Sequence, residues 1–137
     1  MRVALIGSAD FGKATLEAFL ERGDEIVAVF CPPDNPKASK PEVLKEAAIA
    51  RGLNPLQFSS LKSPEAAQAM IDSQADICVM AYVLQFVPQE LCKIPKHGTI
   101  QYHPSLLPKY RGPSAINWAI ALGEDKTGLT IFRPSDG

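Results

Sequence analysis

Short apolar runs, each bounded by turn-forming residues, alternate along this chain with segments of helical spacing. The first run, residues 3–6, ends at Gly7 and has no alternating polar side. Such a run is typical of a strand buried on both faces of a parallel sheet. Parallel strands in this alternation are joined by right-handed crossovers. The pattern therefore predicts an α/β fold with a doubly wound, mostly parallel sheet, whose ligands bind beyond the carboxyl ends of the strands.

The expected elements follow from the runs and from the breaks between them. The strands are residues 3–6, 25–30, 54–58, 76–81, 98–102 and 128–132, with residues 54–58 at a sheet edge. The helices are residues 11–22, 41–51, 64–73, 88–92 and 114–122. Pro41 suits the first turn of the second helix, and Ser63 suits the N-cap of the third.

The chain has the size of one domain and is too nearly neutral for a general nucleic-acid binder. Its 137 residues are 46% hydrophobic and 21% charged, the composition of an ordinary globular domain. Fourteen Lys+Arg against fifteen Asp+Glu residues give a net charge of -1, without a long-range positive field. Any contact with a polyanion therefore has to be local.

The cysteines and the amino terminus indicate a reducing compartment. Cys31, Cys78 and Cys92 form no C-x-x-C pair, so we expect packing residues and no metal site. The first apolar run is too short for a signal peptide, and no stretch approaches the roughly 20 apolar residues that span a bilayer. We therefore expect a cytoplasmic protein with no membrane partner.

The turn after the first strand, residues 7–12, matches a nucleotide-binding loop poorly. Its glycine spacing is G-x-x-x-x-G, and Asp10 puts a negative charge where a phosphate would bind. It is not a P-loop either, because Lys13 is followed by Ala14. We expect a tight strand-to-helix turn and no NAD on this chain.

His103 is the strongest candidate for chemistry. It stands at the carboxyl end of the expected strand 98–102, where doubly wound sheets bind ligands. A structural histidine in a proline-stiffened loop fits the composition equally well. Position alone therefore leaves both interpretations open.

Several motifs in the second half of the chain match a family pattern. They are His103-Pro104-Ser105-Leu106-Leu107-Pro108, Arg111-Gly112, Ser114-Ala115-Ile116-Asn117-Trp118, Ala81-Tyr82, Gln85-Phe86-Val87-Pro88, Leu91, Gly123-Glu124-Asp125, Thr127-Gly128 and Thr130-Ile131-Phe132. Together they resemble the folate-dependent formyltransferase superfamily. Within it, the likeness is strongest to the 10-formyltetrahydrofolate hydrolase domain of formyltetrahydrofolate dehydrogenase, and methionyl-tRNA formyltransferase is a relative.

The resemblance implies a Rossmann-like formyltransferase fold and an enzyme that takes its formyl group from 10-formyltetrahydrofolate, leaving tetrahydrofolate. It makes His103 the catalytic histidine. An imidazole suits a reaction through a tetrahedral intermediate, because it can manage the proton of the nucleophile near neutral pH. Amine-formylating members usually carry asparagine two residues earlier, and this chain has Gln101, whose amide can help bind the formyl oxygen. We therefore expect His103 and Gln101 as catalytic residues.

The resemblance also implies where the folate lies. The expected contacts of its pterin end are Gln85, Phe86, Val87 and Pro88, with further contacts at Ser105, Leu106, Leu107 and Pro108. Phe86 and the two leucines supply apolar walls for a flat ring, although the leucines are also ordinary core residues. Nearby basic residues fit either the glutamate tail of the folate or a solvated rim.

The formyl acceptor stays open between water and an amine. The hydrolase-like pattern favours water, whereas Gln101 keeps an amide donor of the kind that amine-formylating members use. Initiator methionyl-tRNA is the alternative acceptor, but the segment between Phe30 and Pro41 holds only Lys37 and Lys40 for phosphate contacts. A sugar-nucleotide amine or glycinamide ribonucleotide is a further alternative.

By resemblance, residues 1–137 are the N-terminal, folate-binding and catalytic domain, incomplete at its C-terminal end. The aspartate that orients the family's histidine lies in a Leu-Asp-Thr-Gly stretch expected just after Gly137, and Asp136 aligns with the turn before it. A catalytically incompetent folate-binding fragment is therefore the alternative to an enzyme. The missing elements would also expose a sheet edge, so we expect self-association through that edge.

Overall fold

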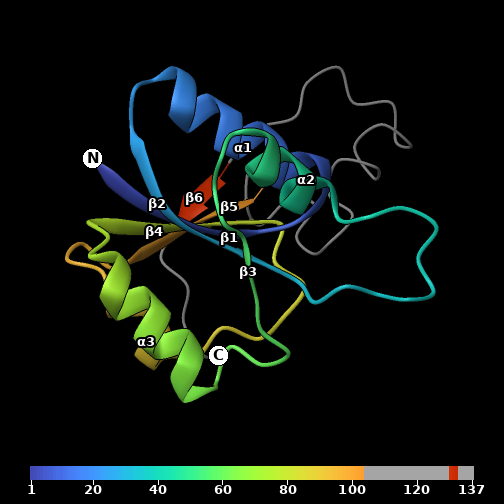
Figure 1. Ribbon diagram of the computed structural model, residues 1–137. Coiled ribbons are helices and arrows are strands. Elements are labelled where there is room, and N and C mark those ends of the chain that lie inside the picture. Colours follow the sequence, from blue (N-terminus) through green and yellow to red (C-terminus); the bar gives the residue numbers. More distant parts are fainter. Residues whose placement is uncertain (104–129, 133–137) are drawn as a thin grey trace.

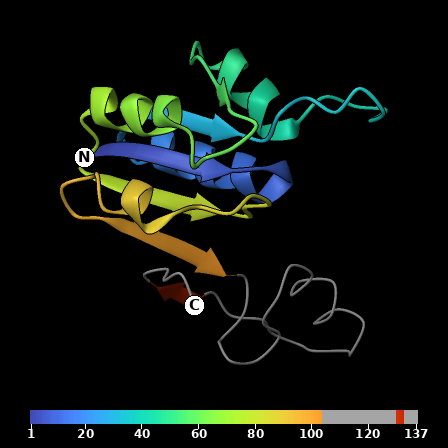
Figure 2. The same cartoon turned by 90° about the horizontal axis from the view of Figure 1, so that it is seen from below.

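The computed structural model of the chain describes residues 1–103 and 130–132. Within them, six strands form one sheet in the order β3-β2-β1-β4-β5-β6. The strands are β1 (Arg2–Gly7), β2 (Glu25–Cys31), β3 (Leu56–Gln57), β4 (Ile77–Ala81), β5 (Thr99–His103) and β6 (Thr130–Phe132). All neighbouring pairs are parallel except β5 with β6, and in Figure 2 the arrowhead of β6 points against those of β1, β4 and β5. The predicted doubly wound, mostly parallel sheet is confirmed.

Helices cover both faces of the sheet. They are α1 (Ala9–Glu21), α2 (Val43–Ala50), α3 (Pro64–Ser73) and α4 (Gln89–Cys92). Figure 1 shows α1 and α2 on one face and α3 on the other. Leu16 and Leu44 bury the first face together with strand residues such as Leu5, while Met70 and Leu91 bury the second. The central strands carry apolar side chains on both faces, which is why their sequences read as continuous apolar runs.

Two helices begin away from their predicted starts. α1 begins at Ala9 rather than at residue 11, and α2 begins at Val43 rather than at Pro41. Glu42 accounts for the second difference, because it is the N-cap of α2 with an extended backbone, and its carboxylate accepts the Leu44 N–H at 3.2 Å. Pro41 therefore lies ahead of the helix and not in its first turn. Ser63 caps α3 as predicted, accepting the Ala66 N–H at 3.2 Å.

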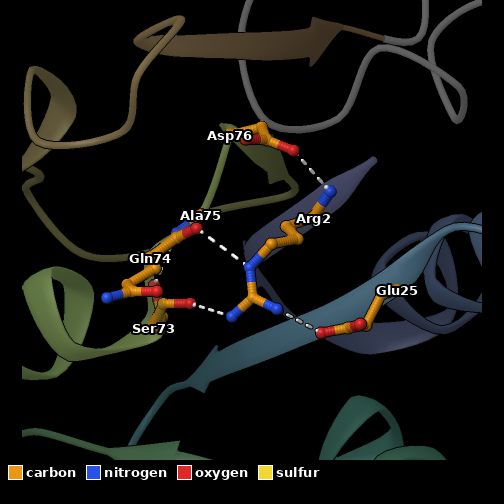
Figure 3. A network of polar contacts seen from close by, with 6 residues as sticks. All are labelled: Arg2, Glu25, Ser73, Gln74, Ala75 and Asp76. Atoms are coloured by element: carbon orange, nitrogen blue, oxygen red, sulfur yellow. Dashed lines mark hydrogen bonds and ion pairs between the residues drawn. The ribbon is translucent and has the colours of Figure 1, made fainter.

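The amino-terminal edge of the sheet is fixed by Arg2 (Figure 3). Its guanidinium donates to the carbonyls of Ser73 at 2.7 Å and Gln74 at 3.1 Å, where α3 ends, and to the Glu25 carboxylate at 2.6 Å. Its backbone N–H donates to the Asp76 carboxylate at 2.9 Å, just before β4. One residue thus joins β1, β2, α3 and β4 at the edge opposite to the carboxyl ends of the strands.

None of the helices in the described part of the chain is long and apolar enough to cross a membrane. The predicted helix at residues 114–122 lies outside the described residues, as do the first two residues of the predicted strand 128–132.

Candidate functional site

The sheet reverses its winding direction between β1 and β4. The chain passes outward from β1 to β2 and β3, then returns to the other side of β1 and continues through β4 to β5. Crevices beyond the carboxyl ends of strands at such a reversal are the usual ligand sites of doubly wound folds. Here those ends are Gly7 and Ala81, which are direct neighbours in the β1–β4 ladder.

The two strand ends approach so closely that a side chain at residue 7 has no room. A Cβ added to Gly7 would lie 2.5 Å from the carbonyl oxygen of Ala81. The N–H of Ser8 donates to that same carbonyl at 3.3 Å. The predicted tight strand-to-helix turn after β1 is confirmed. Its first residue, Gly7, has to lack a side chain because β4 lies against it.

The β4–α4 loop, residues 82–88, leaves the sheet at this reversal. It begins at Tyr82, whose φ of 60° is in the left-handed region. The carbonyl of Tyr82 accepts the Ser8 hydroxyl at 2.7 Å, and Ser8 is buried. The turns after β1 and β4 are therefore joined by a side-chain hydrogen bond.

The predicted pterin contacts in this loop also make contacts within the protein itself. The amide nitrogen of Gln85 donates to the carbonyl of Phe58 at 2.9 Å. Phe86 is 54% exposed, and the Lys62 ammonium lies 5.0 Å from its ring centroid. Val87 packs against the core on the α3 side.

The fourth predicted contact, Pro88, is the N-cap of α4 and ends the loop. Its carbonyl accepts the N–H groups of Leu91 at 3.1 Å and Cys92 at 3.2 Å. Phe86 is thus the predicted contact that offers an apolar surface to solvent, while Val87 and Pro88 fix the end of the loop.

The predicted catalytic residues belong to β5, the next strand beyond β4. Gln101 pairs with Met80 and is half-buried on the face covered by α3 and α4. Tyr102 pairs with Ala81, so the backbone of His103, the last residue of β5, lies level with the start of the β4–α4 loop. The structure thus brings the strand end at His103 and the β4–α4 loop to the same edge. Ser105, Leu106, Leu107 and Pro108 lie outside the described residues.

A carboxylate of the chain itself occupies the amino terminus of α1. Glu42 Oε1 accepts the N–H of Ala9 as well as that of Leu44. A helix amino terminus otherwise offers such donors to external anions. A hollow of about 570 Å³ lies beside Ala9 and Glu42, beyond the carboxyl end of β2, with Lys40 and Lys45 among its lining residues.

Ionic contacts hold the loop after β2 beside this hollow. Lys45 donates to both carboxylate oxygens of Asp34, at 3.0 and 2.9 Å, and the Gln57 amide donates to one of them at 2.9 Å. These hydrogen bonds lower the pKa of Asp34. The Asp34–Lys45 pair therefore adds little net charge to the hollow.

The cysteines are packing residues, as predicted. All three are buried and free of disulfides. Burial raises the pKa of Cys31 and of Cys78 to about 12, so both thiols are protonated near neutral pH and are poor nucleophiles. Among the residues that the structure describes, no three His, Cys, Asp or Glu side chains gather to hold a metal ion.

Three contributors to this edge were not predicted from the sequence: Ser8, Glu42 and Lys62. Ser8 has the sequence position of a helix N-cap, yet its side chain makes no capping hydrogen bond to α1. No local sequence pattern predicts the contacts of Glu42 and Lys62, because their partners are distant in the sequence. Glu42 accepts from Ala9, and Lys62 lies over the ring of Phe86.

Comparison with known families and sequences identifies relatives over the whole chain. The family model described as formyl transferase matches residues 1–137. A methionyl-tRNA formyltransferase of Geobacter metallireducens is 36% identical over 141 residues, covering 100% of this chain and 45% of the relative. A mitochondrial 10-formyltetrahydrofolate dehydrogenase of Mus musculus is 39% identical over 142 residues, covering 100% of this chain and 15% of the relative. The chain thus spans less than half the length of these two relatives.

Solved structures share the fold. A phosphoribosylglycinamide formyltransferase from Bacillus halodurans superimposes with a TM-score of 0.73 at 24% identity, covering 100% of this chain and 73% of that one. A formyltetrahydrofolate deformylase from Pseudomonas syringae superimposes with a TM-score of 0.71 at 20% identity, covering 99% of this chain and 46% of that one.

Proposed function

The chain belongs to the formyl transferase family, and from that premise we propose that it removes or transfers the formyl group of 10-formyltetrahydrofolate, with water ahead of an amine as the acceptor. One observation carries the proposal. The strand that ends at His103 lies beside β4, so the backbone of His103 reaches the same edge of the sheet as the loop that we take as the pterin site. Tetrahydrofolate is the folate product, and neither a metal nor NAD takes part on this chain.

The chemistry needs a proton acceptor and a donor for developing negative charge. In the proposal, His103 takes the proton of the attacking nucleophile and returns it to the leaving nitrogen of the folate. The Gln101 amide donates to the formyl oxygen as the tetrahedral intermediate forms. Its half-buried position on β5 supports this role, because a donor held by a strand needs little reorganisation as charge develops.

The β4–α4 loop serves as the pterin site in the proposal. The exposed ring of Phe86 provides one apolar wall, and backbone groups of the loop meet the polar edge of the pterin. Gln85 donates one N–H of its amide to Phe58, so the amide oxygen and the second N–H remain for a ligand. Ser105, Leu106, Leu107 and Pro108 complete the folate contacts in the proposal.

Water is preferred as the acceptor because the chain resembles hydrolase-type members, and because its net charge of -1 gives no general attraction for RNA. A methionyl-tRNA or another amine is the alternative acceptor. The methionyl-tRNA formyltransferase relative is 36% identical and the 10-formyltetrahydrofolate dehydrogenase relative is 39% identical. Residues 1–137 would form the folate-binding and catalytic domain. The buried free cysteines support a reducing compartment such as the cytoplasm.

The test is a formyl-release assay on the purified polypeptide that carries this sequence. Labelled 10-formyltetrahydrofolate is supplied alone, with methionyl-tRNA, or with glycinamide ribonucleotide, and labelled formate and formylated amines are quantified. We expect formate release in water alone, reduced by at least about a hundredfold in His103→Ala. The matched control is His97→Ala, which removes the histidine just before the other end of β5 and should leave turnover unchanged.

Three outcomes separate the alternatives. If methionyl-tRNA or glycinamide ribonucleotide is formylated and no formate is released in water alone, that amine is the acceptor and water is not. Tetrahydrofolate binding without turnover of any kind would support a folate-binding module and contradict the enzyme. Equal loss in the two histidine variants would contradict the role of His103.

A further inference from the structure

Ser8 uses its hydroxyl in an unusual way for a residue at the start of a helix. It is the N-cap of α1, where a serine oxygen normally accepts a backbone N–H of the first turn, but it makes no such bond. The hydroxyl instead donates to the Tyr82 carbonyl at 2.7 Å, and Ser8 is 1% exposed. The first turn of α1 has another acceptor, because the Ala9 N–H donates to Glu42. Glu42 therefore covers one donor of this turn, and the hydroxyl of Ser8 is directed to the β4–α4 loop and not to α1.

The Ser8 hydroxyl acts on the residue where the β4–α4 loop begins. Tyr82 has a φ of 60°, in the left-handed region that is unfavourable for an L-residue with a side chain. A hydrogen bond to its carbonyl stabilises that conformation and fixes the direction in which the chain leaves β4. Strained backbone held in this way is often found at binding sites.

The loop is held from the opposite side as well. Gln85, three residues after Tyr82, donates to the Phe58 carbonyl at 2.9 Å. The loop is thus hydrogen-bonded at its start to the turn after β1 and near its middle to the segment after β3. Between these two bonds its backbone is held in place before any ligand binds, which lowers the entropic cost of binding.

We propose that Ser8 is a positioning residue for folate binding, because its hydroxyl orients the β4–α4 loop through the Tyr82 carbonyl. The inference rests on the proposed function, since it takes this loop as the pterin site. Ser8 acts through Tyr82 and does not touch the folate. Its removal should therefore weaken binding of the folate more than it slows the chemical step.

The test compares Ser8→Ala with Ser8→Thr, which keeps a hydroxyl. Binding of tetrahydrofolate is measured by calorimetry, and KM and kcat are measured with 10-formyltetrahydrofolate. Loss of one buried hydrogen bond predicts a Kd about five- to tenfold higher for Ser8→Ala, with a similar rise in KM and a smaller change in kcat. Ser8→Thr should recover most of the affinity.

Ser73 provides a matched control at the opposite edge of the sheet. It is 9% exposed, and its hydroxyl also donates to a backbone carbonyl, that of Met70, at 2.7 Å. Ser73→Ala should lower the thermal midpoint to a similar extent and leave the Kd unchanged. If tetrahydrofolate binding is weakened equally in Ser8→Ala and Ser73→Ala, or is not weakened in Ser8→Ala, the role of Ser8 is overturned and the proposed function is not. A wild-type protein that does not bind tetrahydrofolate would overturn the proposed function and this inference with it.

Discussion

The side-chain amide nitrogen of Gln85 lies 2.9 Å from the backbone carbonyl of Phe58 and donates a hydrogen bond to it. The bond joins the β4–α4 loop to the segment between β3 and α3, 27 residues earlier in the chain. The ammonium of Lys62, from that same segment, lies 5.0 Å from the ring centroid of Phe86. The loop expected to bind the pterin is therefore held by contacts with the segment between β3 and α3.

Replacing Gln85 with leucine removes this support while keeping a side chain of similar size. We expect the Kd for tetrahydrofolate to rise about five- to tenfold, because the Phe58 carbonyl loses its donor and the loop loses its anchor. The control is Gln57→Leu, which removes an amide that donates to the Pro32 carbonyl at 3.1 Å and to Asp34 at 2.9 Å, both in the segment after β2. Calorimetry on both variants checks the prediction, and an equal effect in the two would contradict it.

Gly7→Ala tests the close approach of β1 and β4. The new Cβ would lie 2.5 Å from a backbone oxygen of Ala81, so the strand ends must separate. We expect a loss of about 3 kcal/mol or more in the free energy of unfolding, measured with urea, together with weaker folate binding. Gly52→Ala is the control, because a Cβ there meets nothing within 4 Å and adds only the strain of a φ of +75°, about 1–2 kcal/mol. If Gly7→Ala loses less unfolding free energy than Gly52→Ala, the ends of β1 and β4 separate at little cost and the prediction is wrong.

Most of the sheet was predictable because its central strands are buried on both faces. Leu5 and Val79 pack against α1 and α2, while their strand neighbours Ile6 and Met80 pack against α3. Such strands leave continuous apolar runs that a sequence displays directly. The edge strand was predicted as residues 54–58 but pairs only at Leu56–Gln57, since an edge strand has a partner on one side alone.

The candidate site was predictable only in part. Gln85 and Phe86 were found through a family pattern, and the structure shows that they lie on a loop at the carboxyl edge; the roles of His103 and Gln101 stay predictions. Ser8 and Glu42 were missed because the meaning of each depends on a distant partner. The Ser8 bond spans 74 residues and the Glu42 bond to Ala9 spans 33, and neither separation leaves a local pattern.

Arg2→Met should reduce stability without changing folate affinity. The substitution keeps much of the apolar stem but removes the donors to the Ser73 and Gln74 carbonyls at the end of α3, together with the ion pair to Glu25. We expect a loss of about 1–2 kcal/mol in unfolding by urea. Arg51→Met is the control, because Arg51 makes an exposed ion pair with Glu17 at 3.4 Å, which is worth about 0–1 kcal/mol. A changed Kd for tetrahydrofolate in Arg2→Met would contradict the expectation that the edge at Arg2 contributes to stability and not to folate binding.

Asp76 should make the stability of the protein depend on acid pH. Its carboxylate accepts the Arg2 backbone N–H at 2.9 Å, and this bond, helped by Lys96, the amino terminus and His97, lowers the pKa of Asp76 below its ordinary value of 3.8. A carboxyl whose pKa is lower in the folded protein binds fewer protons there than in the unfolded chain. Its contribution is therefore complete above pH 3.8 and is lost as the pH falls through the lower, folded pKa. The amide oxygen of Asp76→Asn still accepts the Arg2 N–H but does not titrate, so the variant should be less stable than the wild type near neutral pH and the difference should shrink in acid. Urea unfolding of both proteins across the acid range measures this, and parallel pH profiles would contradict it.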